Sequence, residues 1–152
     1  MNDRFENFTI SVLKLSKLIQ KIKLLEMEDF GLRAIHVMCI YYLDVNRDGL
    51  TAGELVKMTL EDKAAISRAL GILRDGGYVI YSTKSYNSKA KLTESGEKLA
   101  RFIDERAARA VDAAGSEFSD DERAMLYRSL GMVTENLEAY YKRLASQKDR
   151  EL

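Results

Sequence analysis

The segment from Asp62 to Leu92 gathers small and cationic side chains that could contact nucleic acid. Apolar residues recur there every third or fourth position, which is typical of a helix with one buried face. That apolar face consists of Ile66, Ala69, Leu70 and Leu73. The remaining face would carry Lys63, Ala64, Ser67 and Arg68. Arginine can donate to guanine O6 and N7, and alanine can contact a thymine methyl group, so this face suits the major groove of DNA.

The ends of this helix and the residues after it predict a helix followed by a hairpin. Asp62 can cap the first turn, and Gly76-Gly77 can end the helix. Tyr78–Tyr81 then reads as a strand that Tyr86–Leu92 pairs with on its return. The cations of this hairpin are Lys84, Lys89 and Lys91. We expect them to contact phosphates, although charged residues also protect exposed edge strands from association.

The charge is unevenly distributed along the chain. The 152 residues carry no net charge, yet the stretch from Lys57 to Lys91 holds seven basic side chains against three acidic ones, a local net charge of +4. A local basic surface can bind phosphates while the rest of the molecule stays neutral.

Three motifs in this order resemble the winged helix-turn-helix of the MarR family of bacterial regulators. Asp62–Arg68 matches the start of that family's recognition helix, and Gly77-Tyr78-Val79 matches its exit into the wing. Leu92–Gly96 matches the Leu-Thr-x-x-Gly motif that closes the wing. With the flanking helices, the resemblance covers nearly the whole chain.

The resemblance implies a mainly α fold with a small β-hairpin wing, in one domain spanning residues 1–152. Residues 30–96 would form the DNA-binding part, and residues 1–28 and 97–148 would form dimerisation helices. A homodimer would read a palindrome in double-stranded DNA, because two-fold symmetry places two recognition helices about 34 Å apart. The family also implies repression, and release by a small aromatic effector near His36 and Tyr42.

The wing departs from the family pattern, and this keeps a second interpretation open. The usual wing carries an Asp-x-Arg-Arg tip, whereas no arginine lies here between Arg74 and Arg101. Lysine lacks the planar fork of arginine, so we expect phosphate contacts rather than strong minor-groove reading. The alternative is a dimeric ligand-sensing or protein-interaction module with the same fold and reduced affinity for DNA.

Long helices are predicted at both ends of the chain, each with a narrow apolar seam. The helix over Phe5–Glu26 has Phe8, Val12, Leu15, Ile19 and Ile22 at steps of four and three. The helix over Asp120–Ala145 has Leu126, Leu130, Val133, Leu137, Tyr140 and Leu144. This spacing is that of helices packing side by side, and these seams would form the dimer contact. A third helix, Thr93–Ala114, would pack through Leu99, Ile103, Ala107, Ala110 and Ala114.

Two shorter helices are predicted between the first seam and the recognition helix. Asp29 could cap a buried helix over Phe30–Leu43, which contains His36 and Cys39. His36 could contact a ligand or act as a pH-sensitive switch, and Cys39 could sense oxidants, but ordinary core roles are favoured for both. A capping box at Thr51 and Glu54 would begin the next helix, which would turn Leu55 and Met58 inward.

Several other functions are disfavoured. Asp44–Gly49 resembles the start of a calcium loop, but its twelfth position is Leu55 instead of an acid, and an Asp-Gly turn explains it more simply. No Gly-rich phosphate loop or cluster of metal ligands appears, so neither an enzyme nor a cofactor is expected. With one cysteine no intrachain disulfide can form. No apolar run approaches the ~20 residues that span a membrane, and we expect a cytoplasmic protein.

Overall fold

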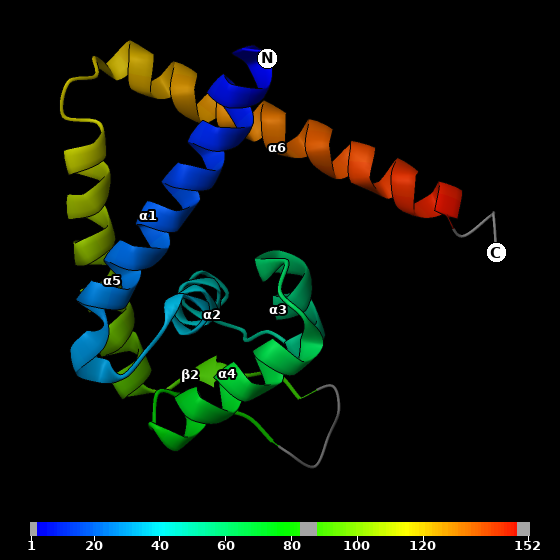
Figure 1. The fold of residues 1–152 in the computed structure, drawn as a ribbon. Coiled ribbons are helices and arrows are strands. Elements are labelled where there is room, and N and C mark those ends of the chain that lie inside the picture. Colours follow the sequence, from blue (N-terminus) through cyan, green and yellow to red (C-terminus); the bar gives the residue numbers. More distant parts are fainter. Residues whose placement is uncertain (1–2, 83–87, 149–152) are drawn as a thin grey trace. The chain divides into compact units, whose positions relative to one another are not determined.

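The computed structural model describes residues 3–82 and 88–148 (Figure 1). Its helices are a π-helical stretch Phe5–Ile10, α1 Ser11–Glu26, a 3-10 turn Glu28–Phe30, α2 Ala34–Val45, α3 Ala52–Thr59, α4 Lys63–Asp75, α5 Glu94–Ala114 and α6 Asp120–Lys148. The strands β1 Val79–Ile80 and β2 Lys91–Leu92 form one antiparallel pair. The expected mainly α fold with a β-hairpin is confirmed. The chain divides into two compact units, Met1–Ala108 and Arg109–Leu152.

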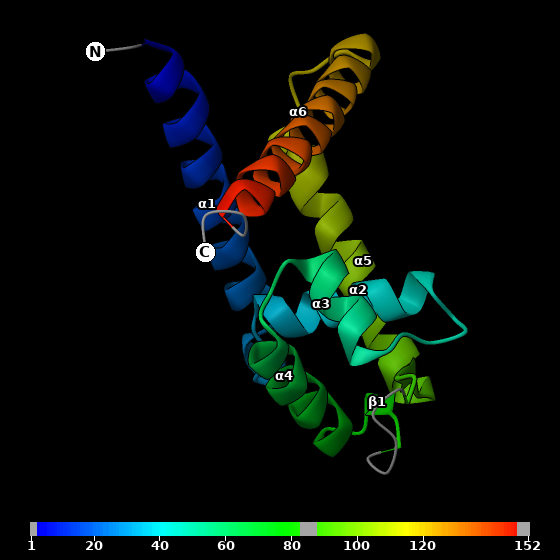
Figure 2. The same ribbon diagram turned by 90° about the vertical axis from the view of Figure 1, so that its right-hand side faces the viewer.

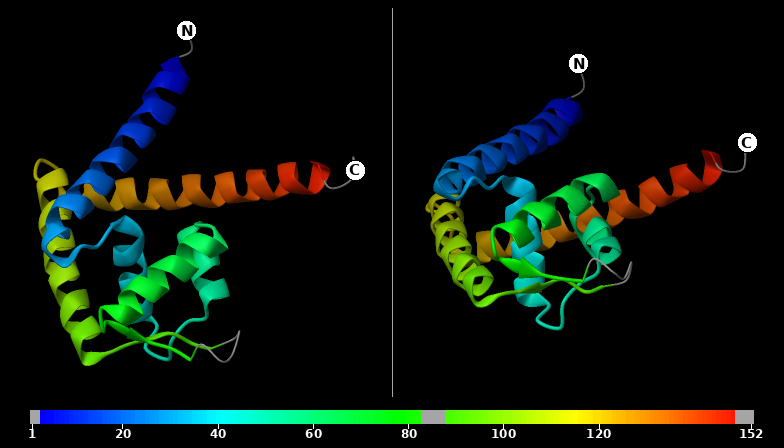
Figure 3. Two further views of the ribbon diagram at one scale, coloured as in Figure 1. Left: turned by 60° about the horizontal axis from the view of Figure 1, so that its bottom comes forward. Right: turned by 90° about the horizontal axis from the view of Figure 1, so that it is seen from below.

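The first unit is built around a small core beneath α4. Helices α2, α3 and α4 pack against one another, and the strands pack against α4 and α2 (Figures 2 and 3). The most deeply buried large side chains of the core are Ile40, Leu43, Leu55, Ile66, Leu73 and Val79. These side chains come from α2, α3, α4 and β1, so this core fixes the helix-turn-helix and the base of the hairpin as one body.

The last turn of α1 is tied to α5 within this unit. Arg106 Nη1 donates to Glu26 Oε2 at 2.6 Å. The same guanidinium lies over the ring of Phe102, at 4.6 Å from its centroid, and Phe102 packs against Phe30. A stacked and hydrogen-bonded arginine at this point holds the C-terminal end of α1 against α5.

The start of α2 corrects the expectation from the sequence. Asp29 does not cap this helix, because it lies in the 3-10 turn, and Gly31 then adopts a left-handed φ of +62°. The helix begins at Ala34 with Arg33 as its N-cap. His36 provides the capping acceptor, since its Nδ1 accepts from Arg33 N at 2.8 Å.

Three smaller differences concern exposure and strand length. Met58 is 39% exposed and does not turn inward as expected, whereas Leu55 is fully buried as expected. On α5, Leu99 and Ile103 are buried but Ala107 and Ala114 are exposed in this chain. Among the described residues each strand holds only two, so the described part of the predicted strands Tyr78–Tyr81 and Tyr86–Leu92 pairs over a shorter length than expected, while Tyr86 and Asn87 lie outside the described residues.

The second unit contains the end of α5, a short turn and α6. Gly115 ends α5 as predicted, and Arg123 Nη2 donates to its carbonyl at 2.9 Å. Ser119 and Glu122 form a capping box at the start of α6, in which Ser119 N donates to Glu122 Oε2 at 2.9 Å and Glu122 N donates to Ser119 Oγ. None of the described helices is long and apolar enough to cross a membrane.

Candidate nucleic-acid interface

Helix α4 is fixed at both ends and along one face. Asp62 Oδ1 accepts from Ala65 N at 2.8 Å, which satisfies a donor of the first turn. Gly77 follows the helix with a φ of +76°, a left-handed conformation that favours glycine. The face that packs into the core consists of Ile66, Ala69, Leu70 and Leu73, as the periodicity predicted. The helix therefore presents one defined surface to solvent.

The four residues proposed for DNA contact lie on that exposed side. They are Lys63, Ala64, Ser67 and Arg68, and all four are exposed. Gly71 and Ile72 extend the same surface by one turn, and the sequence reasoning did not single them out. Ile72 is 50% exposed. Its position four residues after Arg68 was the signal that could have identified it, because residues four apart are neighbours on a helix.

The turn between α3 and α4 sets the angle at which α4 is presented. Thr51 and Glu54 form the predicted capping box at the start of α3. At its end Thr59 Oγ1 donates to Leu55 O at 2.7 Å and accepts from Glu61 N at 3.3 Å. Leu60 lies between them with a φ of +58°, a conformation that costs free energy for a leucine and lasts only where neighbours enforce it.

The base of the hairpin is anchored to the loop before α3. Val79 pairs with Leu92, and Leu50 forms an additional bridge with Ala90. Gly49, at φ +86°, allows this approach, because a Cβ at that position would lie 2.6 Å from the Ala90 carbonyl oxygen. Lys89 and Lys91 are exposed on the returning strand. Lys84, the third proposed phosphate contact, lies outside the described residues.

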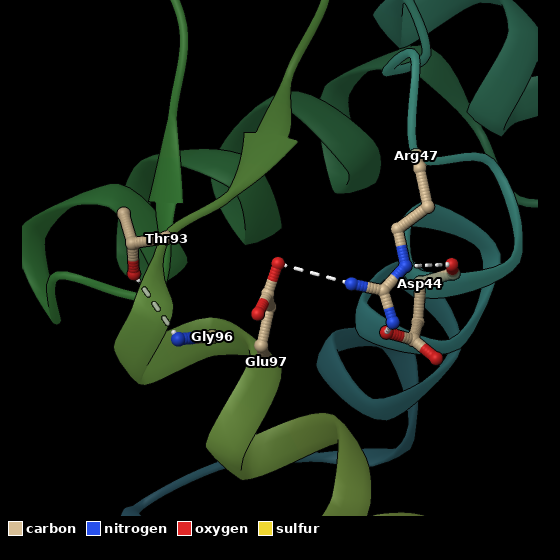
Figure 4. A network of polar contacts seen from close by, with 5 residues as sticks. All are labelled: Asp44, Arg47, Thr93, Gly96 and Glu97. Carbon is tan, nitrogen blue, oxygen red and sulfur yellow. Dashed lines mark hydrogen bonds and ion pairs between the residues drawn. The ribbon is translucent and has the colours of Figure 1, made fainter.

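A polar network joins the loop after α2 to the beginning of α5 (Figure 4). Arg47 contacts the carboxylates of Asp44, at 2.8 Å, and Glu97, at 3.0 Å. Glu97 therefore pairs with a residue 50 positions earlier in the chain. The resemblance to a calcium loop thus has a structural explanation, since Asp44 binds a guanidinium. In the described residues no group of three or more His, Cys, Asp or Glu could hold a metal.

Thr93 links the exit of α4 to the entry of α5. Its hydroxyl donates to Gly77 O at 2.6 Å and accepts from Gly96 N at 3.1 Å. The second bond caps α5, and the first holds the turn that follows α4. Gly96 packs so closely on Tyr78 that a Cβ there would overlap the Tyr78 carbonyl. The Leu-Thr-x-x-Gly motif therefore has a direct structural role in this chain.

His36 and Tyr42, the candidate ligand residues, lie in α2 within the first unit. His36 is 4% exposed and caps the helix, and burial, followed by the charge of Arg33, lowers its pKa. Tyr42 is partly buried, with its ring edge-on to Tyr41 at 5.3 Å. Cys39 is fully buried, and burial raises its pKa to about 12.

An open cavity of about 290 Å³ lies between α1, α2 and the turn before α4. Its lining comprises Val12, Leu15, Ser16, Ile19, Gln20, Lys23, Ala34, Ile35, Met38, Thr59 and Glu61, without His36 or Tyr42. Lys23 is its half-buried cation. Lys23 Nζ lies 3.0 Å from Met38 Sδ, and burial lowers its pKa. A thioether is a weak acceptor, so the amine retains capacity to bind an oxygen of a ligand.

The residues proposed for dimerisation are on largely uncovered helix faces. In the π-helical stretch the residue is Phe8 and on α1 they are Val12, Leu15 and Ile19, all exposed by more than two fifths. On α6 they are Leu130, Leu137 and Leu144, equally exposed, with Val133 partly buried. Each set falls on one face of its own helix.

Comparison with known proteins identifies the fold. No protein-family model and no curated protein matches the sequence. Among solved structures, the chain is similar to a MarR transcriptional regulator from Methanosarcina mazei Go1, with a TM-score of 0.79 and 24% identity over 86% of this chain and 89% of that one. A MarR protein from Peptoclostridium difficile DA00132 gives a TM-score of 0.82 and 20% identity over 91% and 92%.

A third similar structure was solved with DNA. It is a putative MarR family transcriptional regulator from Listeria monocytogenes complexed with a 26mer, with a TM-score of 0.77 and 21% identity over 86% of this chain and 88% of that one. All three cover most of both chains, and each is described as a MarR protein or regulator. The protein therefore has the winged helix-turn-helix fold of MarR-type transcriptional regulators.

Proposed function

We propose that this protein is a transcriptional repressor that binds a palindromic operator in double-stranded DNA as a homodimer. The observation that carries the proposal is the exposed face of α4, where Arg68 lies among small side chains on a helix fixed by its cap and its buried face. A rigid helix that presents an arginine beside small side chains can enter the major groove closely. The Listeria regulator with the same fold, solved on a 26mer, supports this reading.

The proposed dimer uses the exposed apolar seams of α1 and α6. Leu15 on α1 is 51% exposed and Leu137 on α6 is 52% exposed. A second copy would remove such faces from water, which is the main favourable term in association. In this arrangement residues 1–28 and 97–148 serve dimerisation and residues 30–96 serve DNA binding. Two α4 helices would then read two half-sites about 34 Å apart.

The cavity is the proposed site of a small aromatic effector that releases DNA. Its lining includes Glu61, directly before the Asp62 cap of α4, and Ala34 and Ile35 from the first turn of α2. A ligand there would contact α1, α2 and the turn before α4 together. His36 would act indirectly, by holding that first turn of α2, and a direct contact of Tyr42 with the effector stays a prediction.

The second candidate function is a sensor or interaction module that keeps the fold with reduced affinity for DNA. The wing favours this candidate, because its described cations, Lys89 and Lys91, are lysines and no arginine lies between Arg74 and Arg101. Lysines contribute charge to phosphate binding but read base edges less specifically.

Selection of DNA from a random pool at ~0.15 M salt separates the two candidates, because non-specific phosphate binding is weak under those conditions. Recovery of a palindrome with half-sites one helical turn apart is the expected result. If folded, dimeric protein enriches no sequence, the regulator is rejected and the sensor module is adopted.

The recovered operator then tests the residue that leads base reading. Arg68→Ala should weaken operator binding about 10- to 100-fold and relax one position of each half-site. Arg101→Ala, at another exposed arginine that lies on α5, outside residues 30–96 and outside the apolar seams proposed for the dimer, is the matched control and should bind like the wild type. Equal affinities of the two variants would remove Arg68 from base reading.

A further inference from the structure

Ile72 is the one large apolar side chain on the solvent side of α4. The other large apolar residues of this helix, Ile66, Leu70 and Leu73, are at most 3% exposed, whereas Ile72 is 50% exposed. The remaining exposed positions of α4 are small or charged. An isolated exposed isoleucine is common on protein surfaces, so its meaning depends on the groups beside it.

The position of Ile72 relative to Arg68 is set by the helix. Residues four apart lie on the same side, with Cβ atoms about 5–6 Å from each other. One helical turn advances 5.4 Å, while successive base pairs in DNA are about 3.4 Å apart. A base pair adjacent to, or one step beyond, the pair contacted by Arg68 would therefore face Ile72.

The surface next to Ile72 is open on the side of Gly71. A Cβ added to Gly71 would meet no atom within 4 Å, so packing within the chain does not require a glycine there. A glycine inside a helix costs about 1 kcal/mol relative to alanine. With no side chain at Gly71, the branched side chain of Ile72 is left accessible to a base edge.

The chemistry of the major groove defines what an isoleucine could recognise. Of the four bases only thymine presents an apolar group there, its C5-methyl. Isoleucine is stiff about χ1, so it loses little side-chain entropy when it makes such a contact. We infer that Ile72 is a specificity-determining residue that contacts the methyl group of a thymine one or two base pairs away from the pair read by Arg68. This inference rests on the proposed DNA-binding function and adds a base to what α4 reads.

Replacing each operator thymine by deoxyuridine tests the contact, because only the methyl group is removed and base pairing is unchanged. Wild-type protein should lose about fourfold in affinity at one thymine of each half-site, the value for one buried methyl group. Ile72→Ala should bind thymine and uracil at that position equally, and Ile72→Val should retain part of the difference. Any methyl contact of Ala64 would fall on a different thymine and stay sensitive in Ile72→Ala.

Val45→Ala is the matched control, an exposed β-branched residue at the end of α2. It should keep the full uracil sensitivity, and circular dichroism should show that all the variants are folded. The inference is overturned if the wild type is insensitive at every thymine, or if Ile72→Ala keeps the sensitivity of the wild type. Failure to enrich any operator would overturn the DNA-binding function together with this inference. If an operator is recovered but no thymine-to-uracil replacement changes the affinity, the inference alone is overturned.

Discussion

Arg47 and Glu97 form an ion pair across 50 residues of sequence, with Arg47 Nη1 3.0 Å from Glu97 Oε1 (Figure 4). Arg47 Nε also donates to the carbonyl of Asp44 at 2.9 Å. The loop that carries Arg47 continues to Leu50, which bridges to Ala90 at the base of the hairpin. The pair therefore connects the start of α5 to the segment that supports the wing.

Loss of this pair should have a small effect that depends on salt. The side chains of Arg47 and Glu97 are 62% and 40% exposed, and exposed pairs contribute about 1 kcal/mol or less. Arg47→Ala should lower the free energy of unfolding by that amount at 0.05 M salt and by less at ~1 M, where the charges are screened. Urea unfolding measures both values. Lys98→Ala is the control, because it removes an exposed ion pair with Glu94 that lies wholly within α5 and connects no distant segments. A decrease of more than about 2 kcal/mol in the free energy of unfolding that is the same at both salt concentrations would contradict this account.

Replacing Gly96 and Gly71 by alanine should change the free energy of unfolding in opposite directions. Gly96→Ala would drive a methyl group into the Tyr78 carbonyl, and we expect a loss of about 3 kcal/mol or more in the free energy of unfolding. Gly71→Ala meets open space inside a helix and should stabilise the protein by up to about 1 kcal/mol. Thermal or urea unfolding measures the sign of the change for each variant. A Gly96→Ala protein as stable as the wild type would show that the first turn of α5 can move away from Tyr78.

His36 should make the protein less stable in mild acid. Neutral His36 accepts from Arg33 N, and burial holds its pKa below the usual 6.5. The unfolded chain therefore binds a proton first, so stability falls as pH drops below about 6.5 and levels off below the lowered pKa of the folded state. Urea unfolding between pH 5 and 8 should show this slope in the wild type and lose it in His36→Gln. His36 is the only histidine of the chain, so an unchanged slope in that variant would assign the effect to other groups.

Cys39 should be inert in the folded protein. Burial, aided by the negative charge of Glu61, raises its pKa to about 12, so almost no thiolate exists at neutral pH. An aromatic disulfide reagent should leave Cys39 unmodified under native conditions and react at once in denaturant. Rapid modification of the native protein would revive the redox-sensor hypothesis.

Local signals in the sequence were sufficient for the helix-turn-helix. The Asp62 cap, the spacing of Ile66 and Leu73, and the Gly77 exit each depend on neighbouring residues, so they could be read directly. The start of α2 was placed wrongly because Asp29 resembles a cap, whereas the real acceptor is an imidazole, which the usual preferences for capping residues do not include.

Features that depend on packing between distant segments could not be predicted in the same way. The apolar periodicity of α5 continues through Ala107 and Ala114, yet both residues are exposed in this chain. Periodicity shows which residues share a helix face, but it does not show which other segment packs against that face. The cavity joins residues of α1 and α2 to Glu61, and no local pattern brings these together. The proposed roles in DNA binding, dimerisation and ligand binding stay predictions until they are measured.

Contacts between described residues hold the base of the hairpin. Ser82 N donates to Ser88 Oγ at 2.8 Å, just beyond the paired strands and the Leu50–Ala90 bridge. A replacement peptide inserted between these two serines would begin and end at points that the rest of the fold already fixes. The wing is therefore a natural graft site, where an arginine-bearing tip could be exchanged for the native one to alter DNA affinity while the α4 surface is kept constant.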